Sequence, residues 1–129
     1  MIECIGSELI MHNMFIKDII TTSQSVVFIS GSMINQIRNL SMTDENAIAF
    51  HIMNTNITLL DNLNIINATS GIYLEQSQLT LFQNSMIKDC GSTNIINGGA
   101  IFIENSNSTI NNVTFDQNIA KVGGALHIK

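Results

Sequence analysis

Two glutamates, Glu75 and Glu104, are the residues of this chain whose spacing best suits a catalytic pair. Each follows a short alternating segment, so stacking of these segments would place the carboxylates about one strand spacing apart, ~4.8 Å. That separation suits the carboxylate pair of a retaining glycoside hydrolase, and it also suits a weak cation site. Lys129 follows the next such segment, which makes a solvated row of ion pairs the simplest interpretation. We therefore expect no catalytic residue, no metal site and no cofactor.

A polysaccharide lyase would need an arginine or lysine base among several acidic groups. The chain has one arginine, Arg38, and no cluster of aspartates appears in any aligned column of the repeats described below. A degenerate polysaccharide lyase or hydrolase is therefore only an alternative function.

Ring side chains recur at one position of the alternating segments, on the face opposite the apolar side chains. A stack of such segments would form an exposed stripe of rings, which could bind sugar rings or the apolar surface of a partner. The structural alternative is that the rings stack on one another. The two histidines of the stripe would lie three coils apart, too far to share a metal ion. The stripe consists of Phe28, His51, Tyr73, Phe102 and His127.

Cys4 and Cys90 would lie about three coils apart, ~14 Å, beyond the ~7 Å that a disulfide can span. We expect separate thiols or partners outside this segment, so the cysteines do not indicate a redox compartment.

Asn-x-Ser/Thr sequons indicate possible N-glycosylation, if the chain enters a eukaryotic secretory pathway. The possible acceptors are Asn56, Asn107, Asn67 and Asn39, of which Asn56 and Asn107 are expected in loops before a strand. A further sequon at Asn112 is expected to be poorly available, because this residue belongs to the amide column described below. We expect an extracellular or cell-surface location.

Composition limits the classes of protein to consider. The chain has 129 residues, of which 45% are hydrophobic and 12% charged, with a mean hydropathy of +0.26. A chain of this kind forms one folded domain rather than a disordered segment. The net charge of −5 argues against nucleic-acid binding, and no apolar run is long enough to span a membrane as a helix.

A six-residue motif recurs at intervals of roughly 25 residues, which indicates a repeat architecture. It reads apolar, polar, amide, then apolar residues at most of the fourth and sixth positions, and it occupies residues 11–16, 34–39, 60–65, 82–87 and 110–115. If the repeats stack in register, the amides at the third position form a hydrogen-bonded ladder along the axis. The predicted ladder is Asn13, Gln36, Asn62, Asn84 and Asn112.

A second strand-like segment follows each motif, at residues 26–29, 49–52, 71–74, 100–103 and 125–128. Its alternation has a period of two, which places apolar side chains on one face of a strand. One such unit cannot bury its own inner face, but stacked coils bury one another's faces and form a solenoid. The expected inward pairs are Val27 and Ile29, Phe50 and Ile52, Ile72 and Leu74, Ile101 and Ile103, and Leu126 and Ile128.

The last two repeats carry distinctive motifs. Gly98-Gly99-Ala100-Ile101, Gly123-Gly124-Ala125-Leu126 and Phe115-Asp116-Gln117-Asn118 resemble the GGAI and FxxN signatures of the polymorphic outer-membrane-protein repeats of chlamydiae. The resemblance implies a right-handed parallel β-helix of pectin-lyase-like shape and an adhesive role at a cell surface. Upstream, residues 65–68 and 87–90 keep the apolar first position and lack the asparagine. The glycine pairs themselves indicate a corner, where the backbone needs positive φ and adjacent coils approach closely.

Residues 110–118 also fit the leucine-rich-repeat consensus, whose horseshoe needs a helix or other convex segment after the asparagine. The chain instead has two glycines and a second alternating strand there. We therefore predict an all-β, right-handed parallel β-helix of about five coils, formed by residues 1–129 as one solenoid segment of a longer repeat protein. The expected function is a non-catalytic structural or adhesive rod, and the alternative is carbohydrate binding by the ring stripe. The expected partners are other copies or flanking repeats stacked end to end, and surface glycans.

Overall fold

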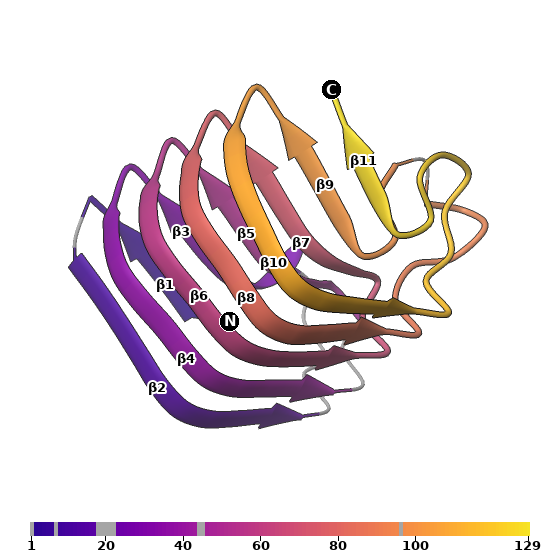
Figure 1. The fold of residues 1–129 in the computed structure, drawn as a ribbon, viewed down its shortest axis with the longest axis horizontal. Coiled ribbons are helices and arrows are strands. Elements are labelled where there is room, and N and C mark those ends of the chain that lie inside the picture. The colour runs from indigo at the N-terminus through magenta and orange to yellow at the C-terminus, as the bar shows by residue number, and fades with distance from the viewer. Residues whose placement is uncertain (1, 7, 18–22, 44–45, 96) are drawn as a thin grey trace.

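The computed structural model describes residues 2–6, 8–17, 23–43, 46–95 and 97–129. These residues wind as a parallel β-solenoid of about five coils, as the sequence predicts (Figure 1). Each coil contributes one long and one short strand, and each strand pairs in parallel with its equivalents in neighbouring coils. No helix among the described residues is long and apolar enough to cross a membrane.

Two sheets enclose the core. The short-strand sheet consists, in spatial order, of β1 (Ile2–Ile5), β3 (Ser25–Ser30), β5 (Ile48–Met53), β7 (Ser70–Glu75), β9 (Ile101–Glu104) and β11 (Leu126–Ile128). The long-strand sheet consists of β2 (Glu8–Lys17), β4 (Met33–Thr43), β6 (Asn56–Ile66), β8 (Gln78–Lys88) and β10 (Asn107–Asp116).

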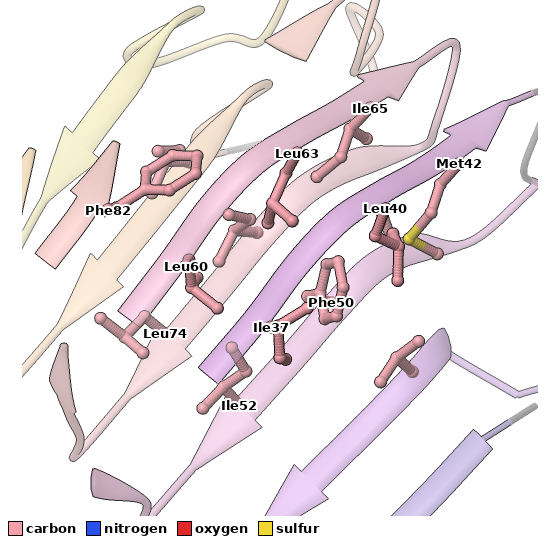
Figure 2. Close-up of a cluster of buried hydrophobic side chains, with 14 of the residues drawn as sticks. Ile37, Leu40, Met42, Phe50, Ile52, Leu60, Leu63, Ile65, Leu74 and Phe82 are labelled. Carbon is pink, nitrogen blue, oxygen red and sulfur yellow. The ribbon is translucent and has the colours of Figure 1, made fainter. Parts of the chain in front are cut away.

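A continuous apolar core fills the space between the sheets (Figure 2). Ile37, Leu60 and Phe82 occupy equivalent positions on three adjacent long strands, and each is fully buried. The inward side chains expected for the short strands are also buried in β3, β5, β7 and β9. In β11 the expectation holds only in part, since Leu126 is half-buried and Ile128 is exposed. In the described part of the chain this strand pairs with β9 alone, so its inward side chains are covered from one side only.

The long strands bend at one asparagine in each coil, and the bends align in the curved ribbons of Figure 1. These asparagines have φ between 49° and 53°, a left-handed conformation that asparagine adopts more readily than most residues. The amide nitrogen of Asn39 donates to Oδ1 of Asn13, and that of Asn62 donates to Oδ1 of Asn39, both at 2.9 Å. The amide of Asn112 donates in the same way to Asn84 at 2.8 Å. The bend residues are Asn13, Asn39, Asn62, Asn84 and Asn112.

Two features of this ladder differ from the sequence prediction. Gln36 is not a member, because it pairs with Ile10 and Leu59 on the outer face of the sheet, and Asn39 takes its place. The ladder is also interrupted at Asn84, whose amide donates to Asp61 at 2.9 Å rather than to Asn62.

Replacing Asn39 with alanine is expected to lower the free energy of unfolding by about 2 kcal/mol. Alanine loses two ladder hydrogen bonds and is strained at positive φ. The matched control is Gln36→Ala, for which we expect a change below about 0.5 kcal/mol. Asn39→Gly should recover part of the loss, because glycine accepts the backbone conformation. Urea denaturation followed by circular dichroism measures all three variants. Equal losses for Asn39→Ala and Gln36→Ala would contradict this account of the ladder.

A second column, of hydroxyl groups, follows the short strands and was not predicted from the sequence. Oγ of Ser77 accepts a hydrogen bond from the backbone N–H of Thr55 at 3.1 Å, and Oγ of Ser106 accepts one from that of Ser77 at 2.9 Å. Each of these hydroxyls also donates to the carbonyl oxygen two residues earlier. The column therefore satisfies backbone groups at a corner where strand pairing stops. Its members are Ser32, Thr55, Ser77 and Ser106.

The glycine pairs occupy the third corner, before the short strands, as predicted. Gly98 and Gly123 have φ of 57° and 61°. A Cβ on Gly99 would lie 2.5 Å from the backbone oxygen of Gly124 in the next coil. The first glycine of each pair therefore supplies the turn, and in the first pair the second glycine permits close approach of adjacent coils.

The asparagine of the FxxN motif binds across coils near the same corner. Asn118 donates through Nδ2 to the carbonyl oxygen of Ile87 at 2.9 Å and accepts through Oδ1 from the backbone N–H of Cys90 at 3.0 Å. The motif thus clamps the turn after β10 to the end of β8 in the preceding coil.

Candidate functional site

The predicted ring stripe exists as a continuous column on the outer face of the short-strand sheet. Its five members pair in register from strand to strand. Neighbouring ring centroids lie 5.3, 5.2, 4.5 and 5.3 Å apart along the column. Three of these four contacts are edge-on, a favourable geometry for ring pairs. The rings therefore stack on one another, while binding of a ligand or partner stays a prediction.

The stripe was expected to be exposed along its whole length, and this expectation is wrong at Phe102. Its side chain is only 1% exposed, so it cannot offer a surface to a ligand. Phe28, His51, Tyr73 and His127 are half-buried and keep some exposed surface.

A groove of about 740 Å³ lies over the middle of the column. His51 and Tyr73 contribute ring side chains to it, and Glu75 contributes a carboxylate at the end of β7. The remaining lining comes from the turns before the short strands, the first residues of β5 and β7, and the longer segment between β8 and β9. It consists of Ser23, Gln24, Asn46, Ala47, Ile48, Thr69, Ser70, Asn94, Ile95 and Asn97.

The segment between β8 and β9 forms one wall of the groove. Isolated bridges to the next coil hold this wall in place. Gly91 forms a parallel bridge with Ile119, and Asn97 forms one with Val122. The backbone N–H of Lys121 also donates to the carbonyl oxygen of Ile95 at 2.9 Å. The two segments, seen together beside β9 and β11 in Figure 1, brace each other and fix Asn94, Ile95 and Asn97 at the edge of the groove.

The two glutamates of the expected pair lie on adjacent strands in register, and each has a basic partner. Nε2 of His51 lies 3.1 Å from Oε2 of Glu75, and Nζ of Lys129 lies 2.6 Å from Oε1 of Glu104. The hydrogen bond to Glu104 raises the pKa of Lys129 above its usual value. Arg38 lies on the long-strand sheet, in register with His12 and Asp61, and so is not brought to these carboxylates. The arrangement matches the ion-pair row expected from the sequence, with the His51 contact as an addition.

Burial raises the pKa of the Tyr73 hydroxyl, and the negative charges of Glu75 and Glu104 raise it further. The hydroxyl therefore stays protonated at neutral pH and can donate a hydrogen bond into the groove. Among the described residues, no three histidine, cysteine, aspartate or glutamate side chains lie together as a metal site would require.

The cysteines and sequons complete the predicted sites. Cys4 and Cys90 are buried free thiols, and burial raises the pKa of Cys90. Asn56 and Asn107 are exposed, but each is the first residue of a long strand rather than part of a loop. Asn67 is exposed after β6. Asn39 is also exposed, and its amide both donates and accepts in the ladder, so its glycosylation stays a prediction.

The comparisons with known proteins bear on the fold. A family model described as the right-handed β-helix region matches residues 6–128 of the chain. No curated protein and no solved structure gives a significant match.

Proposed function

Because this chain belongs to the right-handed β-helix family, we propose that it is a non-catalytic structural or adhesive segment of an extracellular surface protein. The main support is the continuity of its stacked columns, in which amides, hydroxyls and rings recur from coil to coil. Such columns make each coil a template for the next, which is what a rod requires.

The end coils favour further coils as partners. Met14 of β2 and Val113 of β10 point inward and are only half-buried, and each of these strands has one neighbour in the sheet. Another coil, from flanking repeats or another copy, would bury these side chains and pair the free strand edge.

An extracellular location has a direct test. When the chain is secreted from a eukaryotic host, mass spectrometry of its proteolytic peptides should show glycans at Asn56 and Asn107, because both residues are exposed. Asn39 should stay unmodified because the ladder holds its amide. Failure of the chain to enter the secretory pathway, or retention of a folded chain inside the cell, would count against this location.

Non-catalytic function is tested with polyuronides. We expect no increase in ultraviolet absorbance from unsaturated product and no new reducing ends after prolonged incubation. Turnover that disappears in Glu75→Gln would overturn the proposal in favour of the lyase or hydrolase alternative.

The groove favours a second function, binding of carbohydrate. It combines the half-buried ring of Tyr73 with hydroxyl and amide side chains, a composition that suits a sugar with apolar faces and hydroxyl edges. Its position over the ring column agrees with the stripe predicted from the sequence.

Tyr73→Ala is expected to weaken binding to any glycan that the chain recognises on a glycan array, by about tenfold for loss of one aromatic contact. The matched control is Phe28→Ala, which removes a ring of the same column that does not line the groove. Phe102 is unsuitable for this test because it is buried. Unchanged binding in Tyr73→Ala, or equal losses in the two variants, would remove this candidate function.

A further inference from the structure

Among the described residues that line the groove, His51 is the only one with a basic side chain. Its ionisable members are His51, Tyr73 and Glu75. Lys121, on the bracing segment, and Lys129 are not part of the lining, and Lys129 is already paired with Glu104. An anionic ligand would therefore find no lysine or arginine with which to pair among the lining residues that the structure describes.

Two carboxylates lie at or beside the groove, each with a basic partner. The carboxylate of Glu75 is at the groove, and that of Glu104 is its neighbour on the next strand. Burial raises the pKa of the Tyr73 hydroxyl most, the charges of Glu75 and Glu104 raise it further, and the charge of Lys129 lowers it. A ligand carboxylate brought to Tyr73 would lose water and approach the like charge of Glu75, which is unfavourable on both counts.

The uncharged lining supplies a different kind of recognition. Gln24, Asn94 and Asn97 contribute amide groups, each with both donors and an acceptor. Sugar hydroxyls also donate and accept, so they match such a lining without any net charge.

We infer that the groove selects uncharged pyranosides and rejects chains of uronic acids. This inference rests on the proposed carbohydrate-binding function and names its ligand class. The rejection follows from the presence of Glu75 at the groove and from the lack of a lysine or arginine among the described residues that line it. Like-charge contacts of this kind are a common source of specificity.

Paired oligosaccharides that differ only in charge provide the test. Oligogalacturonate is compared with its carboxyl-reduced form, and β-1,4-linked oligoglucuronate with cello-oligosaccharide, by isothermal titration calorimetry at neutral pH. In at least one pair we expect the neutral member to bind at least tenfold more tightly than the acid. Its affinity should hardly change with salt, because no ion pair forms with the ligand.

Glu75→Gln should narrow the difference within a pair by improving the affinity for the acid. The matched control is Glu3→Gln, which makes the same change of charge at an exposed position on β1 outside the groove. Equal or tighter binding of the acid would overturn the inference while leaving carbohydrate binding intact. Equal effects of the two glutamine variants would also overturn it. If none of the four probes binds, the inference is also overturned. If no glycan on the array binds either, the proposed carbohydrate-binding function itself has failed.

Discussion

Phe82→Ala is expected to lower the free energy of unfolding by about 3–5 kcal/mol, as is usual for loss of a fully buried phenylalanine. Phe82 is fully buried between the sheets, and its ring points into the cluster shown in Figure 2. It also stacks in register between Leu60 and Ile110. The resulting cavity would therefore weaken contacts with both neighbouring coils, which is where a solenoid obtains its stability.

The matched control is Leu81→Ala, one residue earlier on the same strand. Leu81 points outward and is half-buried, so its truncation should cost about 1 kcal/mol. Chemical denaturation with tryptophan-independent detection, such as far-ultraviolet circular dichroism, compares the two, since the chain has no tryptophan. Similar losses for both variants would show that the core does not lie between the sheets at this coil.

Gly99→Ala is expected to lower the free energy of unfolding by about 3 kcal/mol through overpacking. An added Cβ would lie 2.5 Å from the backbone oxygen of Gly124 and 2.7 Å from that of Ile119. Backbone oxygens of an adjacent coil cannot rotate away as a side chain can, so the coils must separate. The groove wall should loosen with them, because Ile119 bridges to Gly91 at the base of that wall.

Gly31→Ala is the control that distinguishes the cost of steric overlap between coils from the cost of a left-handed backbone conformation. Gly31 has φ of 58°, and a Cβ there would meet no atom within 4 Å, so only left-handed strain of about 1 kcal/mol is expected. Gly31→Asn should cost less, since Asn54 and Asn105 have φ of 49° and 48° at the equivalent corners. Thermal unfolding ranks the three variants. A melting temperature for Gly99→Ala no lower than that of Gly31→Ala would contradict the close approach of the coils.

The position of the amide ladder in the second repeat could not be predicted from the repeat pattern alone. In the second repeat, residues 34–36 and residues 37–39 both read apolar, polar, amide, so the motif fits at two places three residues apart. The structure chooses the later one, because Ile37, Leu40 and Met42 are the inward positions that stack on the core. Only the asparagine between Ile37 and Leu40 then stands where the strand bends.

The groove could not be predicted, although the ring column beneath it could. Period-two alternation is enough to place His51 and Tyr73 on one face. The wall depends on backbone bridges between the segments that follow β8 and β10, and such bridges leave no side-chain pattern in the sequence. Likewise, the burial of Phe102 depends on the surroundings of β9 and not on its alternation, which is the same as that of Tyr73.

By itself the sequence determined that the chain folds as stacked two-strand units, which side chains of the short strands face inward, and where glycine is needed at a corner. These properties follow from local alternation and from backbone preference, both of which repeat along the chain. Only the tertiary structure decided the register of the second coil, the interruption of the ladder at Asn84, the pairing of His51 with Glu75 and the enclosure of the groove. Those features depend on contacts between residues more than twenty positions apart, where several pairings satisfy the same local pattern and the packing of adjacent coils selects one.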